Sequence, residues 1–210
     1  MNIDGIHAMS LRVLLVLCVL GGALSPVQAQ SGPRARAEAV LPAGTFRDLE
    51  AIANEAGGRG IPTELLYSKA LEGAAKKVPP PMLLSAVRGY AERLGTARQA
   101  FGTEAAAPML VAGADAIQRG VTPDALRSMA EGGHHSPMAV LVLADLVETG
   151  VPSPQALQVL REAMSERMND QRMLQIPEHV RGLMREGHSP MAAAERVWSR
   201  MHRGGGGMGG

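Results

Sequence analysis

In two stretches of the chain, hydrophobic residues recur every three or four positions, which is the spacing of one face of an α-helix. The apolar positions are Leu83, Leu84, Val87, Tyr90, Ala91 and Leu94 in the first stretch, and Met191, Ala194, Val197, Trp198 and Met201 in the second. Residues 138–147 differ, because Asp145 is their only polar residue. A helix that is apolar on all sides is usually buried, so we expect a central helix over 138–147.

Prolines and glycines divide the chain into three similar segments, 60–95, 121–150 and 176–201. Each segment has two arms, and the arms begin at Pro62 and Pro81, Pro123 and Pro137, and Pro177 and Pro190. Proline suits the first helical position, because its φ fits the helix and its missing N–H would have no partner there. Glycine favours the position after a helix, so we expect the arms to end at Gly73 or Gly95, Gly120, Gly132, Gly150 and Gly187. The three segments therefore predict a repeated helical hairpin.

In the expected helical domain, 45–203, hydroxyl side chains precede four prolines, at Thr122, Ser136, Ser153 and Ser189. A hydroxyl at the N-cap accepts a hydrogen bond from a free backbone N–H of the first turn, which stabilises the helix by about 1 kcal/mol. Thr45 is expected to do the same for a first helix over 46–56. The apolar pattern that starts at Pro154 continues to about Leu174, which predicts the longest helix there.

These patterns predict an all-α fold of irregular helical-hairpin repeats, with about eight or nine short helices in a compact or solenoid-like bundle. Residues 45–203 are expected to form this helical-repeat domain. Residues 30–44 are rich in Ala, Arg, Pro and Gly without an apolar period, so we expect a flexible linker. Residues 204–210 are glycine apart from Met208, which predicts a disordered tail.

The N-terminal residues 1–29 have the features of a secretory signal peptide. Arg12 precedes an apolar run over 13–20, and Val27-Gln28-Ala29 is a cleavage site of the small-x-small type. An uncleaved anchor is the alternative, but the run is shorter than the ~20 residues of a membrane span. Translation from Met9 would give a shorter leader of the same type. The chain is therefore expected to be exported, to the periplasm or the medium, with no membrane span after cleavage.

Composition narrows the possible functions further. Cys18, the only cysteine, lies in the predicted leader, so the processed chain would have no disulfide, cysteine nucleophile or cysteine metal ligand. The formal net charge of +1 argues against nucleic acid as the main partner. Aromatic residues make up only 2%, which leaves few side chains on which sugars or bases could stack.

Two sets of residues could bind a metal. The first is His134 and His135, after Glu131, together with His188, after Glu186; if the equivalent loops meet, they offer ligands for zinc or another divalent ion. The second is a set of methionines that each follow a proline and could hold Cu(I): Met82, Met109, Met138 and Met191. The alternative interpretation treats the histidines as polar loop residues and the methionines as core packing.

No pattern in the chain predicts an enzyme. The sequence has no G-x-S-x-G elbow and no phosphate-binding glycine loop, and the serines beside histidines are explained as helix caps. No catalytic residue and no cofactor are therefore assigned. The sequence favours an exported, non-catalytic helical module that binds a protein or peptide partner. A periplasmic metal-binding or metal-sensing protein that uses His134, His135 and His188 is the alternative, and an enzyme of unknown reaction is the third possibility.

Overall fold

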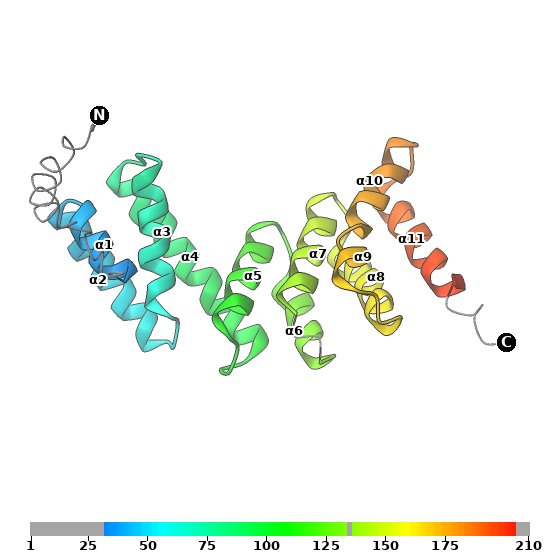
Figure 1. The fold of residues 1–210 in the computed structure, drawn as a ribbon, viewed down its shortest axis with the longest axis horizontal. Coiled ribbons are helices and arrows are strands. Elements are labelled where there is room, and N and C mark those ends of the chain that lie inside the picture. The colour runs from blue at the N-terminus through cyan, green and yellow to red at the C-terminus, as the bar shows by residue number, and fades with distance from the viewer. Residues whose placement is uncertain (1–31, 134–135, 205–210) are drawn as a thin grey trace, which may run out of the picture. The chain divides into compact units, whose positions relative to one another are not determined.

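The computed structural model describes residues 32–133 and 136–204, and this part of the chain contains α-helices and no strand (Figure 1). The helices are α1 (Pro33–Val40), α2 (Ala43–Gly58), α3 (Thr63–Ala75), α4 (Pro80–Phe101), α5 (Ala107–Gln118), α6 (Pro123–Glu131), α7 (Pro137–Glu148), α8 (Ser153–Ser165), α9 (Asp170–Met173), α10 (Ile176–Arg185) and α11 (Pro190–Gly204). The prediction of an all-α fold built from many short helices is confirmed. The predicted signal peptide, 1–29, lies outside the described residues.

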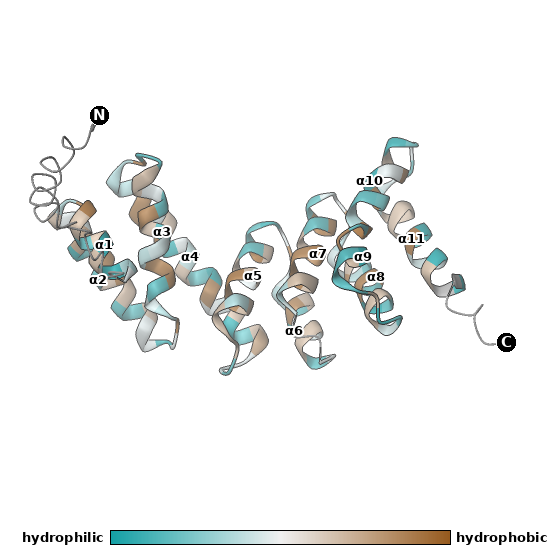
Figure 2. Ribbon diagram, in the orientation of Figure 1, coloured by the Kyte–Doolittle hydropathy of each residue, from teal (hydrophilic) through white to brown (hydrophobic). Residues whose placement is uncertain are grey.

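The helices pack mainly against neighbours in chain order. The main partners of each helix lie within three positions of it along the series, as in the pairs α4–α5, α5–α7 and α8–α11. Most helices carry both hydrophobic and hydrophilic residues (Figure 2), and the hydrophobic ones meet in two clusters. The N-terminal cluster joins α1 to α4 with Leu110 and Ala114 of α5. The C-terminal cluster runs from Ala97 of α4 to Val197 of α11.

Helix α7 is the buried helix that the apolar run over 138–147 predicts. Val140, Val142 and Leu143 have no exposed surface, and α7 packs against α5, α8, α9 and α10. Asp145, the one polar residue of the run, pairs with Arg119 just beyond the end of α5. A helix that is covered by several neighbours needs apolar residues on most of its circumference, which explains the near absence of polar positions.

One turn recurs at six helix ends. A residue with positive φ follows α2, α3, α5, α7, α8 and α10: Gly60, Lys77, Gly120, Gly150, Arg167 and Gly187. The N–H of the next residue donates a hydrogen bond to the carbonyl five residues earlier, as from Val121 to Ala116. This is the Schellman motif, in which the residue after the left-handed position packs back on the helix. The predicted ends at Gly120, Gly150 and Gly187 are confirmed.

Three of the predicted N-caps are confirmed. Thr122, Ser136 and Ser189 accept hydrogen bonds from the backbone N–H groups of Ala125, Ala139 and Ala192. Two predicted caps are wrong, because the helix begins earlier in each case. Helix α2 begins at Ala43 after Pro42, so that Thr45 is buried inside it, and α8 begins at Ser153 after Pro152.

The predicted linker, 30–44, is wrong for residues 33–40. These residues form α1, which starts at Pro33 and packs against α3. Ala37 is completely buried, and Leu41 beyond the helix is nearly so. A two-turn helix needs only these two apolar contacts, so the stretch shows no apolar period. Gly204 is the last residue of α11, and the rest of the predicted tail lies outside the described residues.

Two predicted helix ends are also wrong. Helix α8 stops at Ser165, so the longest helix in the described part of the chain is α4, with 22 residues. Gly73 and Gly95 do not end helices but lie inside α3 and α4. A Cβ at Gly73 would lie 3.1 Å from Cδ1 of Leu83, so this glycine allows α3 and α4 to approach closely.

Candidate functional site

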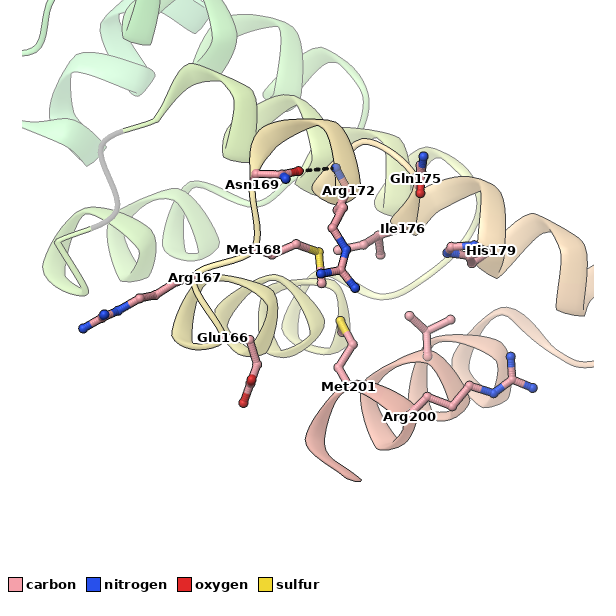
Figure 3. A pocket seen from close by; sticks show the side chains of 11 residues that line it. Glu166, Arg167, Met168, Asn169, Arg172, Gln175, Ile176, His179, Arg200 and Met201 are labelled. Atoms are coloured by element: carbon pink, nitrogen blue, oxygen red, sulfur yellow. Dashed lines mark hydrogen bonds between the residues drawn. The ribbon is translucent and has the colours of Figure 1, made fainter. Parts of the chain in front are cut away.

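A pocket of about 610 Å³ opens between the end of α8, α9, α10 and α11 (Figure 3). Its lining includes four apolar residues, Met168, Ile176, Val197 and Met201. Around them stand the basic residues Arg167, Arg172, His179 and Arg200, and Glu166 is the only acid among the described residues of the lining. A volume of this size is within the range of small-molecule and peptide-anchor sites.

The pocket exists because the chain turns sharply after α8. Arg167 has a φ of +50°, and the N–H of Met168 donates to the carbonyl of Ala163 at 3.0 Å. The side chain of Asn169 then caps α9 by accepting a hydrogen bond from the backbone N–H of Arg172 at 2.9 Å. Helix α9 is only four residues long, so α10 begins almost at once, at Ile176. The turn, the cap and the short helix together leave the space open.

Methionine side chains form the adaptable part of the floor. Ile176 and Val197 are buried, with 2% and 6% of their surface exposed, while Met168 and Met201 are half-buried. Both methionines pack against the C-terminal cluster. In Figure 3 their sulfur ends point toward the same space from opposite sides of the pocket. Unbranched thioether side chains can adjust to guests of different shape.

The guanidinium group of Arg172 stands over this floor. Figure 3 shows it pointing toward the space between the ends of Met168 and Met201, whereas Arg167 and Glu166 extend away from the pocket. Arg200 and His179 lie on the side of α11 and α10. Among the described residues, no acidic side chain pairs with Arg172 or Arg200. The pocket therefore presents unneutralised positive charge beside an apolar floor.

Arg119 shows what an arginine with a structural role looks like in this chain. It joins the end of α5 to α7 through ion pairs with Asp115, Asp145 and Glu148. Burial lowers the pKa of Arg119, but the hydrogen bonds to Asp145 and Glu148 outweigh it and raise the pKa above its ordinary value. This network holds two helices together and leaves no group free for a ligand.

A smaller hollow of about 260 Å³ lies between α8 and α11 and is lined in part by Gln155, Gln158 and Trp198. The buried Oε1 of Gln155 accepts no hydrogen bond in the described part of the chain. Glu195 is the only charged residue of its lining. With less room and less charge, this hollow is a weaker candidate than the pocket beside Arg172.

The predicted metal ligands do not form a site in the described residues. His134 and His135 lie outside them, and His188 sits half-buried in the turn before α11. Residues 32–133 and 136–204 contain no group of three His, Cys, Asp or Glu side chains that could hold a metal ion. The set of His134, His135 and His188 therefore stays a prediction.

The four methionines that each follow a proline differ in their burial. Met109 is buried and Met138 is half-buried, but Met82 and Met191 are 64% and 46% exposed. The interpretation of all four as core positions is therefore wrong for Met82 and Met191, which the helix starts leave on the outside. The sequence pattern does not single out Met168 and Met201, the methionines that line the pocket. Their meeting depends on the left-handed turn at Arg167, where the sequence has no glycine to reveal it.

Comparison with protein-family models, with characterised proteins and with solved structures finds no match to this chain. Within the described residues, no helix combines the length and the apolar character needed to cross a membrane. The function is therefore inferred from the pocket and its chemistry.

Proposed function

We propose that this chain is an exported, non-catalytic helical-repeat module that binds a protein or peptide partner, and that the partner docks at the pocket between α8, α9, α10 and α11. One observation carries the proposal: an open pocket of about 610 Å³ combines a buried apolar floor with Arg172 and Arg200, to which no acid pairs within residues 32–133 and 136–204. Such a combination suits binding, since the floor supplies contact area and the charges fix orientation.

The lining favours binding over chemistry. Its candidate acid–base groups are His179 and Glu166, and Figure 3 shows Glu166 extending away from the pocket. Among the residues that the structure describes, no serine, threonine, cysteine or lysine lines the pocket. A nucleophile within reach of a base, which covalent catalysis needs, is therefore missing from this lining.

Two further parts of the proposal come from the sequence and agree with a binding module. Residues 1–29 would direct export to the periplasm or the medium before they are removed. The similar segments 60–95, 121–150 and 176–201 support an origin of the helices in duplicated hairpins.

Site-specific photocrosslinking tests the proposal in the cell that produces the full chain. A photoreactive residue replaces Gln175, which is exposed at the pocket and makes no side-chain cap bond. The control replaces Glu55 on α2, whose side chain is 77% exposed. The proposal expects a crosslinked partner, identified by mass spectrometry, from position 175 and none of it from position 55. The same products from both positions, or none from 175, would overturn it.

A further inference from the structure

We propose that the pocket recognises an acidic peptide segment, in which a carboxylate pairs with Arg172 and a neighbouring aliphatic side chain lies between Met168 and Met201. This inference rests on the proposed binding function and names the chemistry of its partner. It follows from the charge of the rim, the nature of the floor and the pairing of the surrounding arginines.

The rim selects for negative charge. Three arginines and one glutamate line the pocket; Arg167 and Glu166 extend away from it, which leaves Arg172 and Arg200 as the charged groups of the rim. A guanidinium group binds a carboxylate through two parallel N–H···O bonds, which supplies geometry as well as attraction. A carboxylate is therefore the partner group that the rim fits.

The arginines of the neighbouring helix behave differently. On α10, Arg181 and Arg185 both bind Glu178, at 3.0 Å and 2.9 Å. Arg172 and Arg200 have no such acid within the described residues, although α10 and α11 pack against one another. The arginines of α10 are thus neutralised by an acid of the same helix, whereas Arg172 and Arg200 stay available for a carboxylate of a partner.

The floor selects for an aliphatic side chain beside the acid. Ile176 and Val197 are buried residues of the lining, and the flexible side chains of Met168 and Met201 line the pocket beside them. Burying a leucine-sized side chain there removes apolar surface of both partners from water, which favours binding. An acid alone would gain the charge contact but not this contribution. The combined site therefore fits an acidic segment with interleaved leucine or isoleucine.

Fluorescence anisotropy with the full processed chain tests this directly. The probe is a labelled eight-residue peptide of alternating leucine and aspartate, and the matched control peptide alternates leucine and asparagine. We expect the acidic peptide to bind at least about tenfold more tightly, and its affinity to fall as salt rises from about 0.05 to 0.5 M. Equal affinity for the two peptides, or binding of neither, would overturn the inference.

Variants locate the binding. Arg172→Gln should weaken the acidic peptide about tenfold and leave the asparagine peptide unchanged. Arg196→Gln, an exposed arginine on α11 that does not line the pocket, is the matched control and should change neither. If Arg172→Gln proves unstable in a thermal melt, Arg200→Gln provides the second test of the rim. An acidic peptide that binds equally well to Arg172→Gln and Arg200→Gln would show that its site lies elsewhere.

The two proposals can fail separately. A partner that crosslinks at position 175 but keeps its affinity for Arg172→Gln and Arg200→Gln would overturn the acidic recognition and leave the binding module standing. The absence of any partner at position 175 would remove the binding module, whatever a synthetic peptide does.

Discussion

The turns after α3 and after α8 have the same backbone conformation, but the helices that follow them pack differently. Lys77 and Arg167 both adopt positive φ, of 56° and 50°, where the other four turns of this kind have glycine. The N–H groups of Val78 and Met168 then bond to Gly73 and Ala163 in the same way. The helices after the two turns differ in length, because α4 has 22 residues and α9 has four.

The length of the second helix decides what happens to the hairpin. Helix α4 packs against α2, α3, α5 and α6, and its buried residues join both hydrophobic clusters. Helix α9 makes a single turn, about 6 Å long, and Met173 is its only buried residue. Since so short a helix covers little of its neighbours, the floor of Ile176, Val197 and the two methionines stays open. The same turn is thus followed by a long helix, α4, that packs against α3 in one case, and by a pocket in the other.

The largest expected effect comes from detaching α9. Met173→Ala removes the one buried side chain of α9, which is 4% exposed and packs in the C-terminal cluster. We expect the free energy of unfolding to fall by about 2–4 kcal/mol, because a large side chain is lost and a cavity remains. Urea unfolding followed by circular dichroism measures it.

Gln171→Ala, an exposed position on the same helix, is the control for this substitution and should change stability by less than about 0.5 kcal/mol. A loss below about 1 kcal/mol for Met173→Ala would mean that α9 is not anchored by this side chain. A contact other than the packing of Met173 would then have to hold α9 at the edge of the pocket.

A smaller effect tests whether the two turns are equivalent. Lys77→Gly and Arg167→Gly should each stabilise the chain by about 0.5–1 kcal/mol, because glycine adopts positive φ without the steric cost that a Cβ imposes. This value is the net effect, because the greater freedom of glycine in the unfolded chain offsets part of the steric gain. Urea unfolding of both variants measures the effect.

Glu166→Gly is the matched control for the two turn variants. It changes the residue before Arg167, where φ is −75°, and should lower stability because glycine gains nothing there. If Lys77→Gly stabilises the chain and Arg167→Gly does not, contacts of the arginine side chain must offset the backbone gain. The two turns would then not be equivalent.

The sequence predicts the helices well where their signals are local. The proline start at Pro123, the hydroxyl cap at Thr122 and the glycine end at Gly150 depend only on nearby residues, and the structure confirms these three. Helix α7 is predicted from an apolar run that needs no knowledge of its neighbours. These features are encoded within one or two helical turns.

The pocket is not predictable in the same way. Lysine and arginine at a left-handed turn look like ordinary helix residues, so the sequence pattern runs past the end of α8 and places Met168 inside a longer helix. Met201 approaches Met168 only because α11 packs against α8, which is a contact between distant parts of the chain. The exposed Met82 and Met191 show the same limit: a repeated position does not guarantee a repeated environment.

The smallest effect concerns the charged residues near the C-terminal end of α3. Hydrogen bonds from Lys69, at 2.8 Å, and from Lys76, at 2.5 Å, lower the pKa of Glu72 from 4.5 to about 2. Because the folded pKa is the lower one, Glu72 contributes stability above about pH 4.5, and this contribution is lost as the pH falls toward 2. The side chain is 45% exposed, so solvent screening reduces the contribution to a few tenths of a kcal/mol.

An NMR titration of the Glu72 carboxyl carbon should therefore show a midpoint well below 4.5, moving upward in a Lys69→Ala, Lys76→Ala double variant. An ordinary midpoint in the unmodified chain would mean that these lysines stay solvated and do not hold the carboxylate.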